Sequence, residues 1–127
     1  MIRTLPKFVR FLPAVVWMFF IFFLSSQSTI GIGETRTQRF LILKTFHLIE
    51  YAVLYVLIYF ATNSNKKAIP FAYFYALSDE FHQSLVPGRE GRFTDTLIDL
   101  IGIFIGVLFI KILINLLNTY KKSSSQL

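Results

Sequence analysis

Long apolar stretches separated by short polar ones make up most of the chain. They predict helices at about residues 11–26, 44–61, 68–85 and 93–117. Each stretch has roughly 16 to 25 residues, the length that crosses about 30 Å of hydrocarbon at 1.5 Å per residue. We therefore expect an all-α, polytopic membrane protein that folds as a bundle of four transmembrane helices.

Composition agrees with a membrane location. Of the 127 residues, 54% are hydrophobic and 17% aromatic, which is more apolar than an ordinary soluble domain. The length allows one domain over residues 1–127, with a disordered tail expected at residues 119–127. A basic start before an apolar run is also typical of a cleaved secretory signal. No A-x-A-like site follows the run, however, so we expect it to remain as the first membrane helix.

The positive charges predict the orientation. Lys and Arg number 13 and give a formal net charge of +6. They occur in small groups between apolar stretches, which suits membrane orientation and excludes a nucleic-acid-binding face. Eight of them fall on the side of the two termini and five on the other side. We therefore expect both termini in the cytoplasm and no nucleic-acid partner.

Ionisable residues gather at one predicted depth, near the external face of the membrane. Such groups are costly to place there and are functional candidates for that reason. They come from the outer ends of three different helices, so we expect them to lie in one layer. They are His47 and Glu50 on the second helix, Asp79, Glu80 and His82 on the third, and Asp95 and Asp99 on the fourth, with the polar but uncharged Gln83 beside them on the third.

Within the third helix, the spacing places the polar side chains on two different faces. Asp79, His82 and Gln83 follow i, i+3, i+4 and share one face. Glu80 is turned by about 100° and points toward another helix. A Glu or His tuned toward neutrality is suited to general acid–base work. The alternative is that these groups pair with one another and hold the helices together.

The same residues also allow a metal interpretation. His47-x-x-Glu50 and Asp79-x-x-His82 each place a carboxylate and an imidazole three residues apart, as in carboxylate-bridged helical bundles. Such ligands suit zinc, manganese or iron, and Asp95 or Asp99 from the fourth helix could complete the set. The spacing is common by chance and its order is reversed on the second helix. We therefore assign no metal ligand and leave the cofactor open.

A turn at residues 87–92 carries two glycines and two arginines. Gly88 can take a positive φ, and amides of such a turn can form an anion-binding concavity. Arg89 and Arg92 suit phosphate or carboxylate because a guanidinium binds either with two parallel hydrogen bonds. The alternative is that Arg89 neutralises a nearby carboxylate. In the next helix, Gly102-x-x-x-Gly106 predicts close packing of a neighbouring helix.

In these motifs the chain resembles the VanZ-like family of bacterial membrane proteins. One departure is Asp99, where the family pattern usually has Asn. The resemblance covers about residues 24–110. It rests on Ser25-Ser-Gln-Ser28, Lys44-x-x-His47-x-x-Glu50-Tyr51, Asp79-Glu80-Phe81-His82-Gln83, Pro87-Gly88-Arg89 and Asp95-x-x-x-Asp99-x-x-Gly102-x-x-x-Gly106.

The resemblance implies a small multi-pass protein of the bacterial cytoplasmic membrane. The family is named for a member linked to low-level teicoplanin resistance, and an outward-facing polar cluster fits an anionic cell-wall precursor or another lipid-linked molecule. We expect Arg89 and Arg92 to hold the anion and Glu80 and His82, with Asp79, to carry acid–base chemistry. Further binding residues would be Gln83, His47, Glu50, Asp95 and Asp99.

Two alternatives from other classes stay open. The first is a non-catalytic accessory protein of the membrane whose polar cluster is structural. The second is an ion-coupled transporter, for which four helices are few and the inner halves of the helices carry almost no ionisable residue. Whether the chain is an enzyme is left open.

Overall fold

The computed structural model describes residues 6–124 of the chain and contains only helices within them. The all-α prediction is therefore confirmed for the described residues. The helices are α1 (Lys7–Ser25), α2 (Arg36–Thr62), α3 (Asn65–Ser84) and α4 (Asp95–Ser124).

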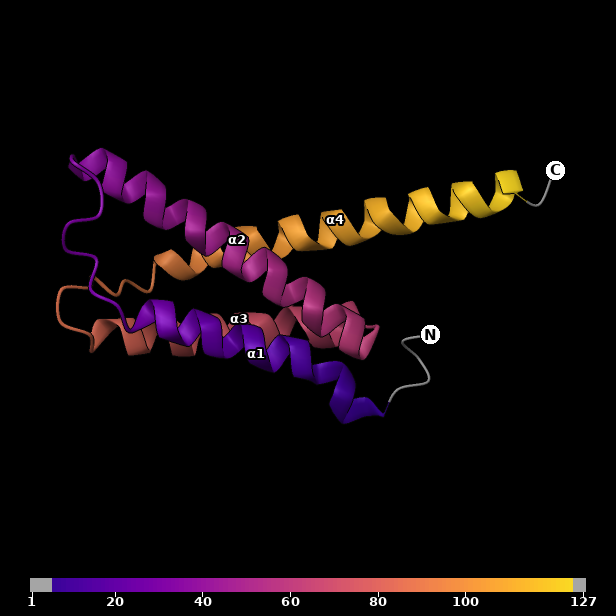
Figure 1. Cartoon of the computed structure of the whole chain (residues 1–127), viewed down its shortest axis with the longest axis horizontal. Helices are drawn as coiled ribbons and strands as arrows, with labels where there is room; N and C mark the ends of the chain where they lie inside the picture. Colours follow the sequence, from indigo (N-terminus) through magenta and orange to yellow (C-terminus); the bar gives the residue numbers. More distant parts are fainter. Residues whose placement is uncertain (1–5, 125–127) are drawn as a thin grey trace.

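Successive helices run in alternating directions (Figure 1). The α1–α2 and α3–α4 connections lie at one end of the molecule, and the short α2–α3 connection lies toward the other. Helix α2 contacts each of the other three helices. The second half of α4 extends beyond its neighbours (Figure 1), and its residues from 111 onward are almost all exposed.

Three helices, α1, α2 and α4, are long and apolar enough to cross a membrane. Helix α3 carries Lys66, Lys67, Asp79 and Glu80 within its 20 residues and does not meet the same condition. The fourth crossing, and with it the cytoplasmic location of both termini, stays a prediction.

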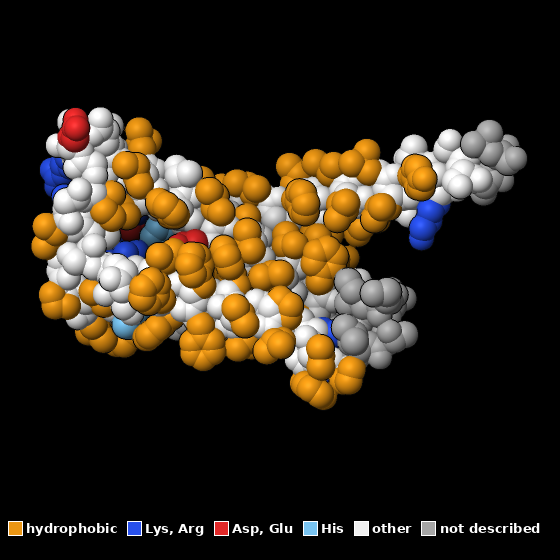
Figure 2. Space-filling view, in the orientation of Figure 1, with side chains coloured by type: hydrophobic (Ala, Val, Ile, Leu, Met, Phe, Trp, Pro, Cys, Tyr) orange, Lys and Arg blue, Asp and Glu red, His pale blue; other side chains and the backbone are white. Residues whose placement is uncertain are grey.

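The outer surfaces of the helices are apolar, as Figure 2 shows along the length of the molecule. Large side chains such as Phe19, Phe74 and Phe104 are more than half exposed. Phe71 and Phe81 extend this apolar exposure along α3. Exposed aromatic surface of this extent suits contact with lipid rather than with water.

The interior combines small residues with large ones. Ala68, Ala72 and Ala76 form one fully buried stripe of α3, and Tyr51 and Tyr55 of α2 are equally buried. The alanines let α3 approach its neighbours closely, and the tyrosines fill the space that remains.

The two glycines of α4 pack against the backbone of α2. A Cβ atom on Gly102 would lie 2.6 Å from the carbonyl oxygen of Leu48, and one on Gly106 would lie 2.8 Å from that of Ala52. Real Cβ atoms essentially never come closer than 3.0 Å. The predicted close packing at Gly102-x-x-x-Gly106 is therefore confirmed.

Helix α2 begins earlier than the apolar pattern indicates, at Arg36 rather than near residue 44. Thr35 starts it with a capping box. Its hydroxyl accepts a hydrogen bond from the Gln38 amide at 3.1 Å, and the Gln38 side chain accepts one from the Thr35 amide at 3.2 Å. The cap adds two helical turns, so Arg36 and Arg39 belong to a helix and not to a loop.

The end of α4 also differs from the expected disordered tail. The helix continues through residue 119 to Ser124. Lys121 and Lys122 lie in its last turn, where positive charge complements the negative end of the helix dipole. Residues 125–127 lie outside the described residues.

Candidate functional site

Polar side chains of several helices lie buried toward the end that holds the α1–α2 and α3–α4 connections. Burial of so many hydrogen-bonding groups in an apolar molecule is costly unless they bind one another or a ligand. The buried polar residues are Ser25, Thr29, His47, Glu50, Asp79, Glu80, Gln83, Thr96 and Asp99.

Three of these residues form a group that joins three helices, which we call the His47–Glu80–Asp99 group. Nδ1 of His47 on α2 lies 2.7 Å from Oδ1 of Asp99 on α4. Glu80 on α3 accepts a hydrogen bond from the backbone amide of Arg92. One potential ligand atom from each of His47, Glu80 and Asp99 lies within 4.8 Å of the other two.

The protein supplies hydrogen-bond partners for only some of the oxygen atoms in this group. Oε2 of Glu80 and Oδ2 of Asp99 are buried and have no hydrogen-bond partner within residues 6–124. The two residues are 2% and 1% exposed. A buried oxygen without a partner costs about 1–3 kcal/mol. These two oxygens are therefore available to a partner that the described residues do not supply, such as a proton, a water molecule or a cation.

A second network lies on the α1 side of α3. Oδ2 of Asp79 accepts hydrogen bonds from the Tyr51 hydroxyl at 3.1 Å and from the Gln83 amide at 2.9 Å. The same Gln83 nitrogen donates to the Ser25 hydroxyl at 3.2 Å. These contacts connect α1, α2 and α3, as a structural role for Asp79 requires.

His82 faces α1. Its Nε2 lies 3.0 Å from the Ser26 hydroxyl, and its ring stacks on Phe22 with the ring centroids 4.3 Å apart. No hydrogen bond or ion pair joins it to Glu80 in the described part of the chain. Residues two apart on a helix are about 200° apart around its axis. The structure thus does not bring the expected acid–base pair together.

The turn at residues 87–92 is tied to the end of α1. Gly88 has a φ of +78°, and its carbonyl oxygen accepts hydrogen bonds from the amide and the hydroxyl of Thr29 at 3.3 and 3.0 Å. Arg89 donates to the carbonyl oxygens of Leu24 and Gln27 at 3.1 and 3.3 Å. Among the described residues its partners are carbonyls, not the carboxylate that the alternative interpretation required.

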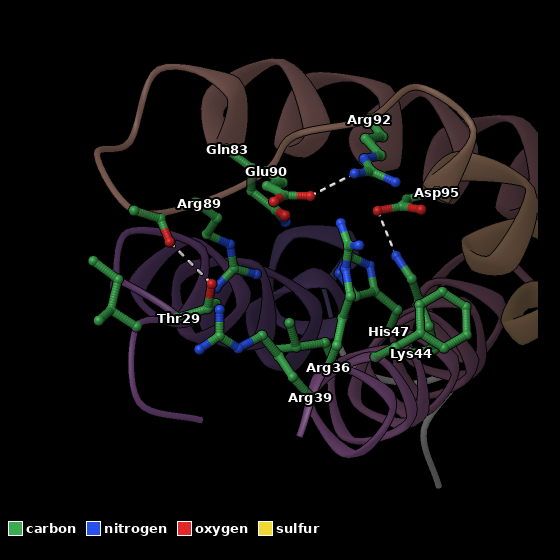
Figure 3. Close-up of a pocket in the computed structure, with 14 residues that line it drawn as sticks. Thr29, Arg36, Arg39, Lys44, His47, Gln83, Arg89, Glu90, Arg92 and Asp95 are labelled. Atoms are coloured by element: carbon green, nitrogen blue, oxygen red, sulfur yellow. Dashed lines mark hydrogen bonds and ion pairs between the residues drawn. The ribbon is translucent and has the colours of Figure 1, made fainter. Parts of the chain in front are cut away.

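Between this turn and the first half of α2 lies a pocket with a volume of about 480 Å³. In Figure 2 it is the hollow where charged side chains come to the surface among apolar ones. Figure 3 shows side chains of α2 on one side of it and those of residues 89–95 on the other. Its lining is Thr29, Ile30, Arg36, Arg39, Phe40, Leu43, Lys44, His47, Gln83, Gly88, Arg89, Glu90, Arg92 and Asp95.

The pocket is strongly cationic, with four arginines and one lysine against two carboxylates. Both carboxylates are already paired, since Lys44 binds Asp95 and Arg92 binds Glu90 at 2.5 Å. The remaining lining cations, Arg36, Arg39 and Arg89, have no carboxylate partner in the described part of the chain. Arg39 donates to the carbonyl oxygen of Ile32 at 3.0 Å and Arg89 to those of Leu24 and Gln27, so these guanidinium groups are hydrogen-bonded but their charges are not neutralised. A concave surface with such charges attracts anions.

Several of the residues expected to bind substrate line this pocket, and others do not. Those in the lining are His47, Gln83, Arg89, Arg92 and Asp95. Glu50 is buried one helical turn beyond His47, and Asp99 lies behind His47 as its hydrogen-bond partner. The expected catalytic residues Asp79, Glu80 and His82 are not in the lining.

Arg36, Arg39 and Lys44 line the pocket, although the apolar pattern does not predict them as binding residues. A signal for them exists in the sequence. Positions 36, 39/40, 43/44 and 47 follow one face of a helix, and all of them line the pocket. The stripe becomes visible once Thr35 and Gln38 are recognised as a capping box.

The family model VanZ/LLP1 matches residues 10–115, which include all four helices for most of their length. The match confirms the resemblance that the motifs indicate. Neither the curated proteins nor the solved structures contain a significant match to the chain.

Proposed function

We propose that this chain, which belongs to the VanZ/LLP1 family, is a multi-pass protein of the bacterial cytoplasmic membrane that binds an anionic cell-envelope or lipid-linked molecule in its pocket. One observation carries the proposal. Three arginines that line the pocket have no carboxylate partner in the described part of the chain, while both lining carboxylates are paired.

The lining supports an amphiphilic ligand. Ile30, Phe40 and Leu43 stand among the cations. Phe40 and Ile30 are largely exposed, so an apolar chain can pass from the pocket into lipid beside them. A phosphate, pyrophosphate or carboxylate head group on a lipid tail combines the two features.

The proposed orientation puts this pocket at the external face. The Lys and Arg distribution favours cytoplasmic termini. The lining residues of the pocket belong to the α1–α2 and α3–α4 connections and to the helix ends beside them, and Figure 1 shows both connections at the end of the molecule away from the α2–α3 connection. Lipid-linked cell-wall precursors are used on that face. We further propose that the chain contributes to teicoplanin tolerance, in line with the association of its family.

Any chemistry on the bound molecule would pass through His47. It lines the pocket, and Asp99 fixes the orientation of its ring. Glu80 lies in the same group and would share the proton. His82 would instead position α3 against α1, because its contacts are with Ser26 and Phe22.

A non-catalytic binding protein is the second candidate. It is favoured by the Tyr51–Asp79–Gln83–Ser25 network, in which Oδ2 of the expected catalytic residue Asp79 is held by two hydrogen bonds within the protein, although its Oδ1 has no partner among the described residues. An ion-coupled transporter is less favoured, since the interior toward the α2–α3 connection is lined by Ile58, Ala68 and Ala72.

The proposal is tested by binding to purified protein in nanodiscs. The probes are a fluorescent polyprenyl phosphate and the matching polyprenol, which lacks the anion. We expect the phosphate to bind more tightly than the alcohol, and Arg36→Gln to weaken the phosphate alone. Lys111→Gln, an exposed cation at the opposite end of the molecule, is the matched control. Equal binding of the two probes would refute the proposal.

A further inference from the structure

The His47–Glu80–Asp99 group has the composition of a metal site. It supplies one imidazole and two carboxylates from three different helices. Their potential ligand atoms lie within 4.8 Å of one another. Atoms bound to one transition-metal ion at about 2.0–2.2 Å each cannot be more than about 4.4 Å apart, so small side-chain adjustments bring all three to a common ion.

The unpartnered oxygens are a separate observation that points to a ligand. Glu80 and Asp99 are buried to more than nine-tenths, and each keeps one oxygen without a hydrogen-bond partner in the described part of the chain. Their other oxygens are held by the Arg92 amide and by His47. The Arg92 contact orients the Glu80 carboxylate as an outer-shell partner orients a metal ligand.

We propose that His47, Glu80 and Asp99 bind one divalent transition-metal ion. Mixed nitrogen and oxygen ligands suit zinc, manganese and iron in the divalent state. Two carboxylates would cancel the charge of such an ion, so the ion removes the cost of burying them. Sequence spacing suggested other pairs, His47 with Glu50 and Asp79 with His82, but the structure places neither Glu50 nor Asp79 in the group.

The location gives the ion access to the pocket. His47 belongs to both, and three protein ligands leave coordination positions open. The metal proposal does not rest on the anion proposal, because it concerns buried groups and is read out by metal binding alone.

A proton shared within the group is the competing explanation for the unpartnered oxygens. It satisfies one oxygen without any metal and predicts no more than non-specific metal binding. The two explanations predict different numbers of metal ions bound per chain. They also predict different effects on metal binding when a carboxylate is replaced by an amide.

The experiment uses the full chain in detergent, stripped with a chelator and dialysed. Zn²⁺ and Mn²⁺ are titrated separately in competition with a chromophoric chelator, and the bound metal is confirmed by plasma mass spectrometry. We expect one equivalent per chain. Glu80→Gln and Asp99→Asn should each weaken binding by more than the roughly 10- to 100-fold that loss of an outer-shell partner causes.

Glu50→Gln is the matched control, because Glu50 is a buried carboxylate of the same helix as His47 and lies outside the group. It should bind metal as the wild type does. Circular dichroism and size-exclusion profiles establish that each variant is folded.

Titration of the wild-type chain with each metal tests for the site even where a variant does not fold. Absence of a stoichiometric site for both ions in the wild type overturns the proposal. Equal metal affinity in the wild type and in a folded Glu80→Gln variant also overturns the proposal. Loss of binding in Glu50→Gln with retention in Glu80→Gln would overturn the ligand assignment in favour of the spacing pairs.

Discussion

Gly102 offers the sharpest test of how α4 packs on α2. A Cβ atom there would lie 2.6 Å from the Leu48 carbonyl oxygen and 3.1 Å from the Leu48 Cα. The substitution Gly102→Val therefore forces the two helices apart by at least 0.4 Å to reach the 3.0 Å that real Cβ contacts observe. Both atoms belong to the backbone, so no side-chain rotation relieves the overlap.

The expected loss of stability follows from this overlap. Overpacking of a close contact costs typically about 1–3 kcal/mol. The gain in helix propensity from replacing Gly is only about half a kcal/mol, because Val is itself a poor helix former. We expect Gly102→Val to lower the free energy of unfolding by about 0.5–2.5 kcal/mol in total. Asp99 lies one turn before Gly102, so the shift should also lengthen its contact with His47.

The assay is equilibrium unfolding in mixed micelles, with the helical signal followed as the fraction of denaturing detergent rises. Ile105→Val is the matched control, because Ile105 is about half exposed on the same helix. It should change stability by less than about 0.5 kcal/mol. A Gly102→Val variant as stable as this control would refute the backbone contact. Rescue by Leu48→Ala would show that side chains, not backbones, set the distance.

Three further predictions concern the cap, the topology and the function. Thr35→Ala removes one half of the capping box and should cost about 1 kcal/mol, measured in the same unfolding assay, and no loss would contradict the cap. The chain lacks cysteine, so single variants report topology: in intact cells an impermeant maleimide should label Glu34→Cys but not Asn63→Cys, and the reverse pattern would invert the orientation. In a teicoplanin-sensitive host at matched membrane levels, wild type should protect and Glu80→Gln should not; equal protection would remove Glu80 from the function.

Much of the fold could be predicted because the apolar stretches are long. Length and hydropathy identify helices in an apolar chain, and Gly102-x-x-x-Gly106 identifies a packing face without knowledge of its partner. The apolar pattern alone puts the start of α2 too late, because Arg36, Arg39 and Lys44 interrupt that pattern while the helix continues. Local capping by Thr35 and Gln38 decides that boundary instead.

The candidate site was predictable as a set of residues but not as pairs. Helical spacing places Asp79 and Glu80 on different faces of α3, and the structure agrees, since they belong to different networks. Which neighbour each one meets depends on the rotation and approach of whole helices. The three-helix group of His47, Glu80 and Asp99 is such a tertiary result, and spacing along one helix cannot reveal it.

The pocket and the buried group share His47, so occupation of one is expected to affect the other. An ion bound to the group would add positive charge beside an already cationic pocket, and would thereby strengthen binding of an anion. Linkage requires that the anion strengthen metal binding by the same factor.

Titrating the polyprenyl phosphate with and without Zn²⁺, and Zn²⁺ with and without the phosphate, measures both factors. The phosphate carries a charge that can itself bind Zn²⁺, so the polyprenol and the Glu80→Gln variant are the controls. Equal factors in wild type that vanish in Glu80→Gln would establish a single coupled site. If neither ligand changes the affinity for the other, His47 does not couple the pocket to the group.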